Sequence, residues 1–242
     1  MTSLDPQLVL GAYAVGVFPM ADSRDAAGVY WVEPRSRAVM PLDGFRLSRS
    51  LRKVIAADRF RVTVDTAFRA VVALCAEQAE DRPETWINSG IEQVFERLHE
   101  MGFAHSVECW DGHRLVGGLY GLALGRAFFG ESMVSRASNA SKVALAHLVA
   151  RLQAGGYALL DCQFQTDHLA SLGAVEISRE AYVALLSDAL SGVVGAPSSA
   201  GAADAAAAGD FFALDRPAGA PAGVVSGPVS GQVIVQLLAH TS

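Results

Sequence analysis

The sequence places a carboxylate and a primary amide one residue apart, at Asp161 and Gln163, directly after the apolar run of residues 157–160. The run predicts a buried strand with polar side chains at its exit. Alternate side chains of a strand share a face, about 6.6–6.8 Å apart, so we expect both to project together and Cys162 to lie in the core. A carboxylate beside an amide can orient an attacking amine and the carbonyl that it attacks. The ordinary alternative is that Asp161 caps the next helix and Gln163 satisfies backbone groups.

A second carboxylate, Glu131, also stands at the end of a hydrophobic strand, in the sequence Gly130-Glu131-Ser132-Met133. Such a side chain accepts hydrogen bonds from an ammonium group or from ribose hydroxyls, or it is a solvated residue at a strand end. Trp86 lies in a polar loop. An indole ring there stacks on a nucleobase or, more commonly, packs onto the core.

Charge is unevenly distributed along this chain, whose net charge is −6. Between residues 35 and 61 there are eight basic residues against two acidic ones, whereas the rest of the chain holds 11 basic and 23 acidic residues. An anionic partner is therefore expected at this basic stretch, which suits contact with a phosphate backbone, although a solvated helix face would carry the same charges. The basic residues of the stretch are Arg35, Arg37, Arg46, Arg49, Arg52, Lys53, Arg59 and Arg61.

Several functional classes are disfavoured by what the sequence lacks. The six histidines have no metal-ligand spacing, which predicts no metal site. The three cysteines are far apart, which favours free thiols in a reducing cytoplasm over a disulfide framework. Residues 217–239 are uncharged, but prolines and glycines interrupt them, so we expect no membrane span. No Gly-x-Ser-x-Gly motif supports a hydrolase.

The elements that must position these residues change period at about residue 103. Before it, apolar spacing predicts helices beginning near Asp5, Ser48 and Asp65 and another over about 88–101. After it, we expect strands over 103–110, 113–122 and 126–134, a helix over 140–154, a strand over 157–163, a short helix over 167–172, a strand over 175–177 and a helix over 178–190. This is an α+β protein, a mixed sheet flanked by helices. Its order resembles the acyltransferase fold of acetyl-CoA-dependent N-acetyltransferases, so we predict a GNAT-like fold.

Composition divides the chain into three parts. Residues 1–64 are expected to form an N-terminal portion with the basic stretch, and residues 65–191 a catalytic domain. Residues 192–242 carry four charges in 51 positions, which predicts a flexible tail at least through Gly209. The end of the tail, residues 231–239, is expected to dock as a short helix.

Seven segments, in unbroken order between about residues 6 and 190, resemble the leucyl/phenylalanyl-tRNA–protein transferases. Each segment alone is weakly specific, but together they are highly specific. They are Ala12–Met20, Arg37–Pro41, Leu47–Lys53, Thr85–Ile87, Gly130–Met133, Asn139–Lys142 and Leu160–Ala174.

The resemblance implies a cytoplasmic enzyme that takes leucine or phenylalanine from its tRNA. The acceptor would be a protein whose N-terminal residue is lysine or arginine. A new peptide bond would form, and the added residue would mark the acceptor for degradation as an N-degron. Methionine remains open as a further transferred residue.

The resemblance also implies roles for individual residues. Asp161 and Gln163 match the family's catalytic strand motif, and Glu131 matches the glutamate of its Gly-Glu-Ser-Met segment. Trp86 matches a tryptophan near the tRNA 3′ end. The apolar pocket for the leucine side chain is assigned to Phe128, Met133 and Leu119, and the tRNA contact to Arg46, Arg49, Arg52 and Lys53.

Two departures from the family pattern stand out. The chain begins close to its Tyr-x-x-Gly-x-Phe-Pro motif, as in a shorter subgroup without an N-terminal extension. Met20 stands where longer members usually have tryptophan, so an aromatic contact to the 3′-terminal nucleotide is either missing or supplied by another residue.

The implied reaction is aminolysis of an ester. An α-amine has an unperturbed pKa of about 7.7–8.0 and is substantially neutral near pH 7.5. We therefore expect catalysis mainly through positioning and oxyanion stabilisation. Asp161 and Gln163 would hold the incoming amine and relay its proton, with Asp161 supplying the basicity or orienting a water molecule. Glu131 would help to fix the aminoacyl end. No cofactor is expected, because the ester already stores the energy.

Two alternatives belong to other functional classes. An acyl-CoA N-acyltransferase would need a glycine-rich turn at a helix N-terminus to bind pyrophosphate, and residues 134–139 contain no glycine. A pure RNA-binding module would not need the pair formed by Asp161 and Gln163.

Overall fold

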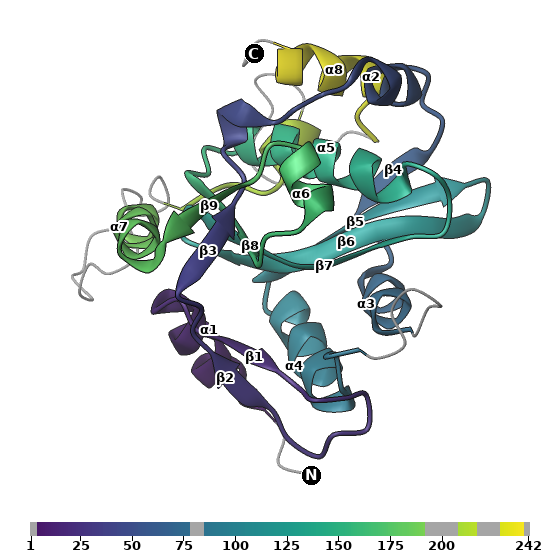
Figure 1. The fold of residues 1–242 in the computed structure, drawn as a ribbon. Coiled ribbons are helices and arrows are strands. Elements are labelled where there is room, and N and C mark those ends of the chain that lie inside the picture. Colours follow the sequence, from purple (N-terminus) through teal and green to yellow (C-terminus); the bar gives the residue numbers. More distant parts are fainter. Residues whose placement is uncertain (1–3, 78–84, 192–207, 217–227, 240–242) are drawn as a thin grey trace.

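A seven-stranded mixed sheet forms the centre of the computed structural model, which describes residues 4–77, 85–191, 208–216 and 228–239 (Figure 1). The strand order is β4-β5-β6-β7-β8-β3-β9. The strands are β3 (Ser36–Val39), β4 (Arg61–Val64), β5 (Ala104–Asp111), β6 (Arg114–Leu124), β7 (Ala127–Ser135), β8 (Leu159–Gln163) and β9 (Val175–Ser178). A separate hairpin pairs β1 (Phe18–Met20) with β2 (Tyr30–Val32).

Helices cover both faces of the sheet (Figure 1). The helices form two groups, one on each face of the sheet. The first group covers a hydrophobic core that we call the α5-side core, and the second group covers the α4-side core. The first group is α2 (Arg49–Ala56), α5 (Ala140–Ala154), α6 (Asp167–Ser171) and α8 (Gly231–Ala239), with the short 3-10 helices η1 (Leu42–Gly44) and η3 (Ala213–Asp215). The second group is α1 (Pro6–Ala14), α3 (Phe68–Ala76), α4 (Ser89–Glu100) and α7 (Arg179–Leu190).

Several helices begin at residues whose side chains cap the helix N-terminus. Asp5 accepts a hydrogen bond from the Gln7 amide and precedes Pro6, a residue well suited to the first helical turn. Ser48 and Asn88 accept from the backbone in the same way at the starts of α2 and α4. Asn139 instead takes a left-handed backbone conformation and makes no side-chain cap at α5.

Strands β7 and β8 are parallel neighbours, whereas the other described pairs of the sheet are antiparallel. Their pairing ends where Phe129 stands opposite Asp161. Beyond that point β7 bulges: Gly130 and Ser132 pair with β6, and Glu131 between them has no partner. Both strands carry polar side chains just past the last paired residues, which brings Glu131 and Gln163 to one place.

The predicted α+β class is confirmed, with a mixed sheet between helices. The three meander strands also appear as predicted, and Gly112, in the turn between the first two, has a left-handed φ of 61°. The likeness to N-acetyltransferases stays a prediction. The expected division at residue 64 crosses the sheet, because β3 and β4 belong to the same sheet as the strands that follow.

The C-terminal part is more ordered than its composition suggested. Helix α8 docks against α2 and α5, as expected, and its N-terminal Gly231 amide donates to Asp58 at 2.7 Å. The segment 208–216 was expected to be mobile near Gly209, yet Phe211 and Asp215 are buried in it. The expectation of flexibility over 192–207 lies outside the described residues.

Candidate active site

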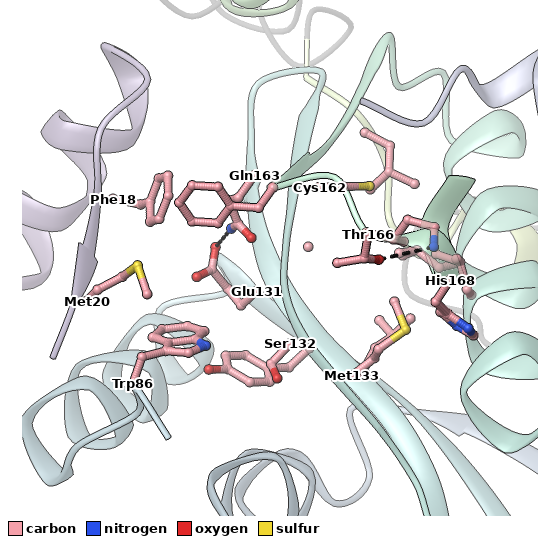
Figure 2. A pocket seen from close by; sticks show the side chains of 18 residues that line it. Phe18, Met20, Trp86, Glu131, Ser132, Met133, Cys162, Gln163, Thr166 and His168 are labelled. Carbon is pink, nitrogen blue, oxygen red and sulfur yellow. Dashed lines mark hydrogen bonds between the residues drawn. The ribbon is translucent and has the colours of Figure 1, made fainter. Parts of the chain in front are cut away.

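A mostly apolar cavity of about 260 Å³ lies where β7 and β8 separate, covered by α5 and α6 (Figure 2). The apolar side chains that line it come mainly from β7, β8 and α5. Its rim is formed by β1, the loop before α4 and the segment after β8. The cavity is lined by Phe18, Met20, Trp86, Leu119, Tyr120, Gly130, Glu131, Ser132, Met133, Leu145, Leu148, Leu160, Cys162, Gln163, Phe164, Thr166, His168 and Leu169. It therefore joins residues that lie up to 151 positions apart in the chain.

The polar end of the cavity is a carboxylate–amide pair. Gln163 Nε2 donates a hydrogen bond to Glu131 Oε1 at 2.9 Å, and Figure 2 shows the two side chains pointing toward one another. The other oxygen, Glu131 Oε2, is buried and has no hydrogen-bond partner among the described residues. Burial raises the pKa of the Glu131 carboxyl to about 8; the nearby Tyr13 hydroxyl opposes the rise, and the charge of Asp161 adds to it. Glu131 is thus a carboxyl group suited to exchanging protons near neutral pH.

Asp161 is closed off from this cavity. It has no exposed surface and does not line the pocket. Its carboxylate forms an ion pair with Arg37, whose Nη2 lies 2.6 Å from Oδ2 and whose Nε lies 2.9 Å from Oδ1. The Tyr182 hydroxyl donates to Oδ2 at 2.8 Å.

The expectation that Asp161 and Gln163 face the substrates together while Cys162 faces the core is wrong. Strand alternation holds from Leu159 to Cys162, and it turns Asp161 toward α1 and α7 and Cys162 toward the cavity. Gln163 does line the cavity, as expected, and its backbone is left-handed, with a φ of 58°. Burial raises the pKa of the Cys162 thiol well above its usual range, so the thiol stays protonated and is a poor nucleophile.

Arg37 is the main residue that the sequence analysis misplaced. We had counted it in the basic stretch that meets an anionic partner, but it is only 2% exposed. Its guanidinium lies between the Phe18 and Tyr182 rings, at 4.7 and 4.5 Å from their centroids, and Nη1 donates to the Gly16 carbonyl at 3.0 Å. Arginine buried between two rings and a carboxylate is a structural cation. No local sequence feature distinguishes it from its exposed neighbours.

The apolar pocket assignments hold in part. Leu119 and Met133 line the cavity, as does Trp86, and the contacts of all three with a substrate stay predictions. Phe128 does not: its ring is fully buried and stacks on Phe211 at 5.7 Å. The sequence analysis missed the residues of α5 and β8 that complete the floor, whose signal was ordinary helical and strand periodicity. They are Leu145, Leu148 and Leu160.

The four residues assigned to tRNA contact share an exposed surface beside α2. All four are exposed, and no described residue forms an ion pair with them. Helix α2 turns its apolar face toward α5 and α8 and leaves the three cations that it carries outward, whereas Arg46 precedes the helix. They are Arg46, Arg49, Arg52 and Lys53.

The described residues contain no cluster of three or more histidine, cysteine or acidic side chains able to hold a metal ion. None of the described helices is long and apolar enough to cross a membrane. Residues 217–227, part of the segment rejected as a span, lie outside the description.

Comparison with known proteins identifies the family. Residues 39–187 match the family model described as leucyl/phenylalanyl-tRNA protein transferase, and residues 2–35 match the N-terminal domain of the same transferase. The chain belongs to the leucyl/phenylalanyl-tRNA–protein transferase family. Arg37 lies between the two matched regions and ties one to the other.

Individual relatives bear the family's name. A leucyl/phenylalanyl-tRNA–protein transferase of Rhizorhabdus wittichii is 62% identical over the full length of both chains. One of Zymomonas mobilis is 62% identical over 78% of this chain and 70% of its own. One of Rhodospirillum rubrum is 57% identical over 78% of this chain and 89% of its own. The family resemblance drawn from seven short segments is thus confirmed.

Proposed function

We propose that this transferase moves a leucyl or phenylalanyl residue from its tRNA to the N-terminal lysine or arginine of an acceptor protein. The observation that supports it best is an apolar cavity closed at one end by the Glu131–Gln163 pair. Family membership supplies the reaction class, and the cavity fits the aminoacyl end of such a substrate.

The size and lining of the cavity match an amino-acid side chain. Pockets for drug-sized ligands are about 300–1,000 Å³, and this one, at about 260 Å³, suits one hydrophobic side chain and its ester. Leu119, Met133 and Leu148 offer flexible apolar contacts without a buried charge. Met133 adapts its shape easily, which supports acceptance of leucine, phenylalanine and methionine.

Glu131 and Gln163 are the groups proposed to meet the reacting atoms. The neutral amine of the acceptor attacks the ester carbonyl, a C–N bond forms, and the C–O bond to the ribose breaks. One proton leaves the nitrogen for the Glu131 carboxylate, and that carboxyl returns a proton to the departing ribose oxygen. A pKa of about 8 for Glu131 lies close to the pKa of about 7.7–8.0 for an N-terminal amine, so the transfer from nitrogen to the carboxylate is nearly balanced, and the return of the proton to the more basic ribose oxygen is downhill.

The tRNA is proposed to bind across two regions. Trp86, at the cavity rim, offers an indole face to the 3′-terminal base, and Met20 beside it offers an apolar contact instead of a second tryptophan. The exposed cations Arg46, Arg49 and Arg52 would contact backbone phosphates farther from the ester. Binding of the two large substrates supplies most of the catalysis.

The setting of the reaction is likewise a proposal. No disulfide joins the described cysteines, in keeping with a reducing cytoplasm. Transfer of leucine or phenylalanine to an acceptor would mark it for degradation, as the family resemblance implies.

A transfer assay tests the proposal directly. The purified chain is mixed with leucyl-tRNA carrying labelled leucine and with a peptide that begins with lysine. Label should enter the peptide, and ribonuclease or N-acetylation of the peptide should abolish the transfer. A peptide that begins with glutamate serves as the matched control for acceptor choice.

Two outcomes would contradict it. Acyl transfer from acyl-CoA, with none from leucyl-tRNA, would indicate an N-acyltransferase. Tight tRNA binding without transfer to any peptide would indicate an RNA-binding module.

A further inference from the structure

The carboxylate of Asp161 is fully committed to protein partners. Oδ1 accepts from Arg37 Nε at 2.9 Å and from the Gln163 backbone amide at 2.8 Å; Oδ2 accepts from Arg37 Nη2 at 2.6 Å and from the Tyr182 hydroxyl at 2.8 Å. Two oxygens with four donors have no lone pair left for a substrate. Since Asp161 is also fully buried and absent from the cavity lining, it does not touch the reacting atoms.

The bond from the Gln163 amide to Asp161 fixes an unusual backbone. Gln163 has a left-handed φ of 58°, a conformation that residues other than glycine rarely adopt. The hydrogen bond holds this residue in that conformation. The same turn sends the Gln163 side chain to the cavity, where it donates to Glu131. Asp161 thereby sets the direction of the amide that closes the cavity.

We infer that Arg37 and Tyr182 are positioning residues that act through Asp161 to hold the Gln163 amide against Glu131. The inference rests on the proposed function and deepens it. It removes Asp161 from the proton route and assigns a role to two side chains that lie 145 positions apart in the sequence.

The geometry explains why these residue types are needed. The planar guanidinium of Arg37 spans both carboxylate oxygens, stacks between two aromatic rings and still reaches the Gly16 carbonyl. A lysine ammonium is a point charge and cannot make all these contacts. Burial, and then the charge of Asp161, raise the pKa of the Tyr182 hydroxyl well above its usual range, so it remains a donor.

The Arg37 contacts also reach the cavity wall. Phe18, which stacks on the guanidinium, lines the cavity, and Gly16 lies two residues before it. The Arg37 guanidinium therefore fixes the position of Phe18, at the cavity wall, relative to the turn formed by Asp161 and Gln163. Loss of the contacts on either side shifts the Gln163 amide relative to the aminoacyl end.

A double-mutant cycle tests this inference. Single-turnover transfer at saturating leucyl-tRNA and lysine peptide is measured for Tyr182→Phe, Gln163→Ala and the double variant. Tyr182→Phe keeps the ring and removes one bond to Asp161; it should slow transfer about tenfold, within the range expected for a misplaced group. In the Gln163→Ala background the same change should have almost no further effect, because the residue through which it acts is gone.

Tyr157→Phe is the matched control. Tyr157 is a buried tyrosine of the α5-side core and contacts neither Asp161 nor Gln163. Its replacement should leave the transfer rate unchanged. Arg37→Lys provides a second variant, which should slow transfer more than Tyr182→Phe while keeping the charge.

A readout that does not need activity separates this inference from the proposed function. In protein labelled with ¹⁵N-glutamine, the Gln163 side-chain amide is assigned by its disappearance in Gln163→Ala. Its resonances should shift in Tyr182→Phe and stay in place in Tyr157→Phe. Equal slowing by Tyr182→Phe in both backgrounds, or an unmoved Gln163 amide, would overturn the positioning role. If the wild-type protein transfers nothing, the proposed function fails and the amide resonances alone decide this inference.

Discussion

Two buried arginine–aspartate pairs serve different purposes in this fold. Arg37 and Asp161 meet beside the cavity, at 2% and 0% side-chain exposure. Arg151 of α5 and Asp215 of the C-terminal segment meet on the other side of the sheet, at 4% and 6%. The charge chemistry is the same, yet the first pair orients a backbone turn at the cavity and the second pins a distant segment of the chain. A buried ion pair alone therefore does not mark an active site; the neighbours of the carboxylate do.

The second pair is embedded in an aromatic stack. Arg151 Nη1 also donates to the Phe211 carbonyl at 3.0 Å, and Nη2 donates to Asp215 at 2.9 Å. The Phe211 ring lies between His105 and Phe128, stacked on both. Segment 208–216 thus completes the α5-side core, and no residue of it lines the cavity.

The largest combined effect on stability and on transfer is expected at the first pair. Asp161→Ala leaves the Arg37 guanidinium buried without its anion, which costs about 3–5 kcal/mol of unfolding free energy. It also frees the Gln163 turn, so single-turnover transfer by the folded fraction should fall roughly 10²-fold. Urea denaturation followed by circular dichroism gives the stability, and the transfer assay the rate. A stable, fully active variant would refute the role assigned to this pair.

Asp215→Ala is the corresponding change in the second pair. It should cost a similar amount, about 3–5 kcal/mol, because Arg151 is left buried and unpaired. The folded fraction should transfer leucine at the wild-type rate, since the cavity is untouched. Removal of residues 192–242 should destabilise the chain at least as much, because Phe211 and α8 are lost with it. A folded Asp215→Ala protein that cannot turn over would erase the distinction between the two pairs.

Glu131 offers a third, contrasting case: a buried carboxyl without a cation. Its pKa is about 8 in the folded protein against about 4.3 when unfolded. The folded state therefore binds the proton more tightly, and the stability from this group is present below about pH 4 and lost as pH rises toward 8. Unfolding free energy should fall over this range in the wild type and change less in Glu131→Gln.

The same substitution changes the pH dependence of transfer. If the ionised carboxylate accepts the amine proton, the wild-type single-turnover rate rises up to about pH 8. Glu131→Gln should be slower by roughly 10²–10⁴ and should keep only the titration of the acceptor amine. Parallel pH profiles for the two proteins would remove Glu131 from the proton route.

The smallest effect is expected from basic side chains that are exposed on the surface. Changing Arg49, Arg52 and Lys53 together to alanine should leave stability nearly unchanged, because all three are exposed. It should weaken tRNA binding and flatten its dependence on salt, since fewer counterions are released. Affinity measured between 50 and 200 mM salt (the range over which such contacts weaken) tests this. An unaltered slope would mean that these cations only solvate α2.

The periodicity of the sequence was enough to predict where these helices and strands lie. Strands β5, β6 and β7 begin and end within about two residues of the expected bounds, because alternation and the Gly112 turn are local properties. The helices that begin at Pro6, Arg49 and Ser89 start within about one residue of the expected positions. The order of segment 208–216 was missed, because the composition of residues 192–242 as a whole hides its buried anchors, Phe211 and Asp215.

The site was harder to predict because it depends on pairings across the chain. Glu131, Gln163 and Trp86, which line the cavity, were singled out from the sequence and the family resemblance. The orientation of Asp161 was not predicted correctly. Arg37 and Asp161 are separated by 124 positions, and no local pattern pairs them. The left-handed backbone of Gln163 is likewise not indicated by any local pattern. Both facts are tertiary.

The insertion of β3 between β8 and β9 bears on how the protein is made. Ribosomes add about 5–20 residues per second, so β3 leaves the ribosome on the order of ten seconds before its two partner strands. Until then the sheet cannot close, and Arg37 has no Asp161 to meet. Such distant pairings also slow folding, since the connecting chain must be closed into a loop first. A nascent chain therefore cannot form the Arg37–Asp161 pair, or the Gln163 turn that Asp161 holds, before β8 has been made.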